Sequence, residues 1–174
     1  MKIAVIGYSG SGKSTLAEKM GRAHECEVLH LDRVHWLPGW QERPVQESLQ
    51  IVGAFMDENE SWIIDGNYSR LLYERRMREA DMIIFMCFNR FACLLRALSR
   101  YRTYKGRTRA SMTEGCDERL DAGFVRWILL DGRSGKIRER YRRVQEEYAG
   151  KMIVIRSQRE LDAFAASLAA ACGQ

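Results

Sequence analysis

The sequence predicts an α/β fold in which helices cover both faces of a five-stranded, mostly parallel sheet. Short apolar runs rich in β-branched residues alternate with longer segments of helical periodicity along the whole chain. Strands that alternate with helices in this way build parallel sheets through right-handed crossovers. The first apolar run also leads into a glycine-rich segment, Gly7–Thr15, that suits a turn from a strand into a helix.

Residues Gly7–Thr15 fit the P-loop pattern G-x-x-x-x-G-K-[ST] at every fixed position. Residues 2–6 before it are expected to form a buried strand, and residues 15–20 after it are good helix formers. Glycines that accept positive φ let successive N–H groups form an anion-binding nest at the helix N-terminus. The fold class is therefore a three-layer P-loop NTPase. The predicted nucleotide-binding residues are Gly7, Ser9, Gly10, Ser11, Gly12, Lys13, Ser14 and Thr15.

Within this motif, Lys13 is expected to reach the β- and γ-phosphates of a nucleotide and to act in catalysis. The Ser14 hydroxyl is expected to bind Mg²⁺. ATP and Mg²⁺ are therefore the predicted cofactors.

The 174 residues, 46% of them hydrophobic, predict one domain, 1–174, with a sizeable core. No apolar run reaches about 18 residues, and no signal-peptide pattern occurs, so we expect a cytoplasmic protein that does not enter a membrane. It is expected to be a monomer or homodimer. The cysteines show no metal-binding spacing and are expected to be reduced thiols. They are Cys26, Cys87, Cys93, Cys116 and Cys172.

The net charge of +5 comes mainly from one segment. No acidic residue lies between Asp81 and Glu114, whereas seven cations do. Such a segment is either the lid of an enzyme or a nucleic-acid surface. The cations are Arg90, Arg96, Arg100, Arg102, Lys105, Arg107 and Arg109.

A second strand is expected over residues 27–32, with Asp32 at its carboxyl end. Ligands of open α/β sheets bind beyond the carboxyl ends of the strands. Asp32 is therefore expected to hold a Mg²⁺-bound water or to take a proton from an attacking hydroxyl; the alternative is a capping role. His30 is expected to be a hydrogen-bonded strand residue rather than a catalytic one.

Two indoles, Trp36 and Trp40, flank a Pro-Gly turn. They either stack on a planar acceptor group or cap the core. A helix is expected from Pro44. The apolar face of this helix is expected to carry Val45, Leu49, Val52 and Met56.

Residues 61–65 predict a third strand that delivers Asp65 to the same edge of the sheet. A buried strand that ends in Asp behind a P-loop is the Walker B arrangement, in which the carboxylate holds Mg²⁺ through water. The residues that follow, Asn67, Tyr68 and Arg70, are expected to face the acceptor.

The remaining elements complete the alternation of strands and helices. A fourth strand is expected over 81–88, with Asp81 as a cap at the end remote from the site. The next helix is marked by Phe91, Leu94, Leu95 and Leu98. The basic segment that follows, about 101–118, is expected to be a loop or mobile lid. Helices are then expected near 120–128 and 137–148, a fifth strand at 152–155, and a last helix that packs Leu161, Phe164 and Leu168 inward.

These motifs resemble adenylate kinase and the nucleoside monophosphate kinases. More closely, they resemble the DNA topology modulation proteins, a family built on an adenylate-kinase-like P-loop fold. The runs that carry this resemblance are His30-Leu31-Asp32, Trp36-x-Pro38-Gly39-Trp40, Trp62 to Tyr68 as WIIDGNY, and Gly115-Cys116-x-Glu118-Arg119.

The kinase resemblance implies roles for several further residues. Arg96 and Arg100 look like the first arginine pair of the lid, and Arg133 or Arg138 would complete a second pair. The loop 157–159 would lie beside the adenine. The kinases carry Asp-Gly-Phe-Pro-Arg, whereas this chain reads Asp-Gly-Asn-Tyr-Ser-Arg over 65–70, which weakens the case for AMP as acceptor.

Two functions remain at this stage. The first is a phosphotransferase that moves the γ-phosphoryl group of ATP–Mg²⁺ to a small hydroxyl or phosphate acceptor bound near Asp32, Trp36 and Trp40. The alternative is a nucleic-acid-associated regulator that binds ATP and affects DNA topology. The cation cluster fits both, but helix-turn-helix, zinc and RNA-binding signatures are absent, so nucleic acid is the less favoured partner.

Overall fold

The computed structural model describes residues 1–172, with side-chain burial described to residue 168. Its centre is a five-stranded parallel sheet with the strand order β2-β5-β1-β6-β7, and β3 and β4 form a separate antiparallel pair. The predicted α/β fold is confirmed. The strands are Lys2–Gly7 (β1), Glu27–His30 (β2), Trp36–Leu37 (β3), Gln41–Glu42 (β4), Trp62–Asp65 (β5), Met82–Met86 (β6) and Met152–Ile155 (β7).

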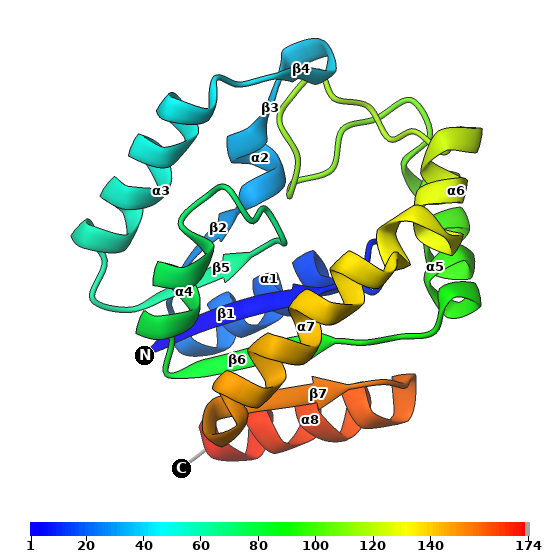
Figure 1. The fold of residues 1–174 in the computed structure, drawn as a ribbon. Coiled ribbons are helices and arrows are strands. Elements are labelled where there is room, and N and C mark those ends of the chain that lie inside the picture. Colours follow the sequence, from blue (N-terminus) through cyan, green and yellow to red (C-terminus); the bar gives the residue numbers. More distant parts are fainter. Residues whose placement is uncertain (173–174) are drawn as a thin grey trace.

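Helices cover both faces of the sheet, as right-handed crossovers between parallel strands require. Helices α1 and α8 contact each other on one face, and α4 and α7 lie across the other (Figure 1). The helices are Lys13–His24 (α1), Leu31–His35 (α2), Val45–Glu58 (α3), Tyr73–Glu79 (α4), Arg90–Tyr104 (α5), Ala122–Leu129 (α6), Gly135–Glu147 (α7) and Gln158–Cys172 (α8).

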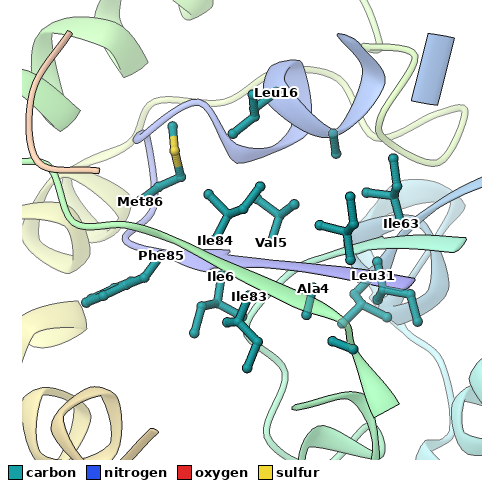
Figure 2. Close-up of a cluster of buried hydrophobic side chains, with 14 of the residues drawn as sticks. Ala4, Val5, Ile6, Leu16, Leu31, Ile63, Ile83, Ile84, Phe85 and Met86 are labelled. Carbon is teal, nitrogen blue, oxygen red and sulfur yellow. The ribbon is translucent and has the colours of Figure 1, made fainter. Parts of the chain in front are cut away.

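The core lies around the central strand β1, whose residues Ile3–Ile6 are completely buried. Figure 2 shows side chains of β1 and β6 packed on both faces of the sheet, with Leu16 of α1 over one of them. Parallel strands covered by helices on both sides are continuously apolar for this reason. The sheet edge that ends at Gly7, His30 and Asp65 is therefore held on a rigid support.

The second strand is shorter than the sequence predicts. It ends at His30, and Asp32 lies in the first turn of helix α2. Leu31, which is completely buried, packs so closely under Gly66 that a Cβ there would lie 2.8 Å from the Leu31 Cβ. This packing turns the chain away from the sheet. An acidic side chain is also favourable in the first turn of a helix.

Helix α5 is present as predicted, but two residues that mark it in the sequence face outward. Phe91 and Leu95 are each 67% exposed, and the smaller Cys93 and Ala97 are buried instead. The reason is the close approach of this helix to the P-loop, because a Cβ at Gly10 would lie only 2.5 Å from the Cys93 carbonyl oxygen. Small residues permit that approach.

The basic segment is partly helical. Residues 101–104, predicted as part of the loop, belong to α5, which continues until Lys105 leaves helical geometry and Gly106 takes φ +69°. Irregular chain follows to α6. The prediction for Val45 is also wrong, because this residue is 42% exposed and does not belong to the buried face of α3. Val52 and Met56 of the same helix are buried as expected.

The irregular segment 105–121 lies against the β3–β4 hairpin (Figure 1). The Thr113 hydroxyl hydrogen-bonds the Trp36 carbonyl oxygen at 2.6 Å, and the Gly39 N–H donates to the Gly115 carbonyl at 3.2 Å. The Cys116 thiol donates to the Leu37 carbonyl at 3.2 Å. These three hydrogen bonds tie the segment to the β3–β4 hairpin.

Several smaller expectations have clear outcomes. Asp81 has a structural role, because its carboxylate accepts the Lys2 N–H at 2.7 Å and so fixes the start of β1. Leu161, Phe164 and Leu168 of α8 pack against the core as predicted. Four cysteines are free thiols: Cys26, Cys87, Cys93 and Cys116. The side chain of Cys172 lies outside the described residues. Within the part of the chain that the structure describes, no helix has the length and apolar character needed to span a membrane.

Candidate active site

The P-loop joins β1 to α1 with three glycines in the positive-φ region: Gly7 at 143°, Gly10 at 78° and Gly12 at 94°. Gly12 is the N-cap of α1, and it provides no side chain to satisfy the first N–H groups of the helix. Free N–H groups at a helix N-terminus form an anion-binding site. The Lys13 ammonium donates to the Tyr8 carbonyl at 3.1 Å, so it lies over the same loop.

Gly7 is also required by packing. A Cβ at this position would lie 2.4 Å from the Met86 carbonyl oxygen of the neighbouring strand. We expect Gly7→Ala to lower the free energy of unfolding by about 3 kcal/mol, because backbone strain and overpacking add. Gly150→Ala is the matched control, since a Cβ there would meet nothing within 4 Å. Denaturant unfolding of both variants measures the difference; equal stabilities would contradict the packing argument.

Asp65 ends β5 beside the P-loop and is only 4% exposed. One carboxylate oxygen lies 3.0 Å from His30 Nδ1, and the other, Oδ1, is buried with no hydrogen-bond partner among the described residues. His30 is thus hydrogen-bonded, as predicted. Asp65 and Ser14 line the same cavity. A carboxylate oxygen without a partner among the described residues and a nearby hydroxyl suit a hydrated Mg²⁺, so these residues fit this ion.

Asp32 and Tyr68, distant in sequence, meet at this edge of the sheet. The Tyr68 hydroxyl donates to Asp32 Oδ1 at 2.8 Å. Burial, followed by the Asp32 charge, raises the pKa of Tyr68 well above its usual value, so the phenol stays protonated and remains a donor. Its bond fixes the carboxylate that the sequence nominates as the catalytic base.

The two indoles, Trp36 and Trp40, pack edge-to-face with ring centroids 5.4 Å apart. The His35 ring lies 4.6 Å from both the Trp36 and the Tyr68 rings, and the Arg119 guanidinium lies over Trp40. Both indoles line a cavity, and neither belongs to the hydrophobic cluster of the sheet. Of the two alternatives left by the sequence, a cavity wall describes their position better than a core cap.

Asn67 is engaged by the protein itself. Its side-chain oxygen accepts the Gly7 N–H at 2.9 Å, and its amide nitrogen donates to the Gly7 carbonyl oxygen. The sequence nominates Asn67 as an acceptor-binding residue, but the structure places its amide on the entry to the P-loop. Arg70, by contrast, is exposed at the cavity.

The predicted lid arginines differ in their partners. Arg96 donates to the Ser11 carbonyl at 2.6 Å, bonds Gln158, and lies 4.0 Å over the Phe88 ring. Arg100 instead binds a carboxylate of the basic segment: its Nε and a terminal nitrogen lie 2.8 and 2.7 Å from Glu118 Oε1.

Glu118 is 7% exposed and also pairs with Arg109, whose Nε lies 2.6 Å from Oε2. A single buried carboxylate therefore joins α5 to the segment 105–121. In the sequence Glu118 appears only within the run that carries the family resemblance, and no ion-pairing role is predicted for it.

We expect Glu118→Gln to lower the free energy of unfolding by about 3 kcal/mol, since it leaves two largely buried guanidinium groups without a counter-charge. The exposed Glu114, four residues earlier, provides a matched control as Glu114→Gln. Chemical denaturation of both variants measures the effect. A loss no greater than that of the control would mean that the pairs contribute little.

The sequence left Arg133 and Arg138 as candidates for a second arginine pair. Arg133 is bound to backbone carbonyls, at 2.7 Å from Phe88 and 3.2 Å from Ile128, and lies 3.7 Å over the Tyr8 ring. Arg138 is exposed, and Arg140 is the α7 arginine that lines the cavity. Neither predicted arginine therefore faces the site directly in this structure.

A cavity of about 1240 Å³ brings most predicted site residues together. Gly7 and Ser11 do not line it, and of the loop 157–159 only Gln158 does. The predicted residues that line it are Ser9, Gly10, Gly12, Lys13, Ser14, Thr15, Asp32, Trp36, Trp40, Asp65, Asn67, Tyr68, Arg70, Arg96 and Arg100.

Comparison with known families decides which family this site belongs to. The model of a family described as an AAA domain matches residues 3–125, which include the P-loop, Asp32 and Asp65. The chain belongs to this AAA domain family. No curated protein matches the chain.

Solved structures share the fold of this AAA domain. Deoxyadenosine kinase from M. mycoides with bound dATP is 15% identical, with 97% of this chain and 99% of that chain covered and a TM-score of 0.56. A gluconokinase from Sinorhizobium meliloti 1021 is 16% identical, with 99% and 91% covered and a TM-score of 0.51. At such low identity the likeness concerns the fold alone.

Proposed function

We propose that this protein is a phosphotransferase that moves the γ-phosphoryl group of ATP–Mg²⁺ to a small hydroxyl or phosphate acceptor. The observation that carries the proposal is the shared cavity, in which the P-loop and the Asp32–Tyr68 pair face the same space. A phosphoryl donor and an acceptor group must meet in line in this reaction. The two similar structures are also named as kinases.

In this proposal the P-loop N–H groups and Lys13 hold the β- and γ-phosphates. Asp65 and Ser14 would hold Mg²⁺, which supplies positive charge that offsets the charge of the phosphates. For a hydroxyl acceptor, Asp32 takes the proton while the acceptor oxygen bonds to the γ-phosphorus and the bond to the β–γ bridging oxygen breaks. Arg96 and Arg100 would stabilise charge on the transferred group.

The acceptor would lie between the aromatic wall and the segment 105–118, which we propose as the lid of a single domain, 1–174. Trp36, Trp40, Tyr68 and Arg70 are the residues that we expect it to contact. Arg109, Met112 and Glu118 bring the lid to the same cavity.

Within the AAA domain family, the runs WIIDGNY and Gly115-Cys116-x-Glu118-Arg119 support membership of the DNA topology modulation proteins. That name describes an association with DNA rather than a reaction. Arg100, Arg109 and their shared partner Glu118 all line the cavity, and this position favours a lid over a DNA-binding surface. The cytoplasmic location and the monomeric or homodimeric state stay predictions.

An ATP-consumption screen over nucleosides, nucleotides and small hydroxylated metabolites tests the proposal. We expect ATP turnover to rise with one chemical class of acceptor. Hydrogen exchange over residues 105–118 provides a second measurement, since a lid should slow its exchange when a non-hydrolysable ATP analogue and Mg²⁺ are added. Exchange that responds to duplex DNA and ignores the nucleotide would favour the regulator.

A further inference from the structure

Arg76 of helix α4 is completely buried, although it makes none of the ion pairs found among the described residues. Burial lowers its pKa to about 10, and the charges of Tyr73 and Asp65 oppose that shift. The guanidinium therefore remains charged at neutral pH. A buried charge costs several kcal/mol unless hydrogen bonds compensate it, so its partners are informative.

All three partners are carbonyl oxygens of the short loop that follows β5. Nε donates to Leu71 at 2.9 Å, and the two terminal nitrogens donate to Gly66 at 3.1 Å and to Tyr68 at 2.8 Å. Arg76 does not line the cavity. Its hydrogen bonds therefore act on the path of the loop rather than on a ligand.

That loop carries two contacts with the candidate site. Asn67, between two of the carbonyls bound by Arg76, holds both backbone groups of Gly7 at the entry to the P-loop. Tyr68 holds Asp32 with its hydroxyl. Asn67 thus contacts the P-loop on the nucleotide side of the site, and the next residue, Tyr68, contacts Asp32 on the acceptor side.

We propose that Arg76 is a positioning residue that sets the loop 66–71, so that Asn67 fixes the P-loop while Tyr68 fixes the base Asp32. The inference rests on the proposed phosphotransferase function. In this proposal a buried arginine sets the position of the P-loop relative to Asp32. A rigid fork with several donors is suited to this task, and a lysine ammonium, which is a compact point charge, does not offer the same planar arrangement of donors.

A double-mutant cycle tests this role. We expect Arg76→Lys and Tyr68→Phe each to lower kcat by about tenfold, and the double variant to be no more than about threefold worse than either. That coupling is expected if Arg76 acts through Tyr68. Arg75→Lys is the matched control, because Arg75 pairs at the surface with Asp57 and Glu79; we expect its kcat to match the unaltered protein. A hundredfold loss in the double variant would overturn the proposal, and so would an unchanged kcat in Arg76→Lys.

Hydrogen exchange tests the positioning role of Arg76 without an activity measurement. We expect Arg76→Lys to speed exchange at residues 66–72 at least tenfold. Ile155→Ala, in the buried part of the edge strand β7, controls for a general loss of stability, and it should leave these amides less affected than the rest of the sheet. Uniformly faster exchange in Arg76→Lys would reduce the residue to a structural role. If the unaltered protein transfers phosphate to no acceptor, the proposed function fails, whereas this exchange result still decides the role of Arg76.

Discussion

Lys13→Ala is expected to lower kcat by about a thousandfold or more while the fold remains intact. Lys13 lies over the P-loop, with its ammonium 3.1 Å from the Tyr8 carbonyl, and is only partly exposed. In phosphoryl transfer the protein acts mainly by positioning groups and stabilising charge, and one well-placed cation contributes 10² to 10⁵ in rate. The Tyr8 carbonyl is a neutral partner, so removal of the ammonium leaves no buried charge uncompensated.

Steady-state turnover with the acceptor found by screening, together with binding of a fluorescent ATP analogue, measures this effect. Nucleotide affinity should weaken as well, because the ammonium contacts the phosphates before and during transfer. Lys136→Ala, at an exposed lysine of α7, controls for the loss of one positive charge. Unchanged turnover in Lys13→Ala would remove the nucleotide-site assignment, and an unfolded variant would show that the lysine is needed for the fold.

The nucleotide half of the site was predictable because its information is local. Gly7, Gly10 and Gly12 and the lysine after them lie in one segment, and the backbone geometry that they require follows from residue type alone. The strand-end position of Asp65 followed in the same way from an apolar run. The parallel sheet then brings these ends to one edge.

The residues that join the two halves were not predictable in that way. Arg76 occupies the buried face of a short helix between Tyr73 and Met77, and an arginine at such a position is a signal only once that face is known. Glu118 is one of several acidic residues in a loop, and its two partners come from different elements. Phe91 and Leu95 mark helix α5 in the sequence but face outward, since close approach to the P-loop selects small side chains at the buried positions. Long-range contacts decide all these cases.

Asp32→Asn is expected to lower kcat by about a thousandfold and to leave nucleotide affinity nearly unchanged. The amide is similar in shape, and its oxygen can still accept the Tyr68 hydroxyl, which is 2.8 Å from Asp32 Oδ1 in the structure. It cannot take a proton from an acceptor hydroxyl, and a general base contributes about 10² to 10⁴ in rate. The loss should therefore fall on kcat rather than on binding.

The substitution Asp65→Asn distinguishes the role of Asp65 from that of Asp32. Its buried Oδ1 has no hydrogen-bond partner in the part of the chain that the structure describes, so the substitution should mainly raise the Mg²⁺ concentration needed for half-maximal turnover. Excess Mg²⁺ should restore part of the rate. Asp57→Asn, at an exposed residue that pairs with Arg75, is the control for both variants. Mg²⁺ titrations of kcat on the three variants decide the matter. Restoration of Asp32→Asn by Mg²⁺ would make Asp32 a second metal-binding group, and identical effects of the two substitutions would contradict the division of roles between base and metal ligand.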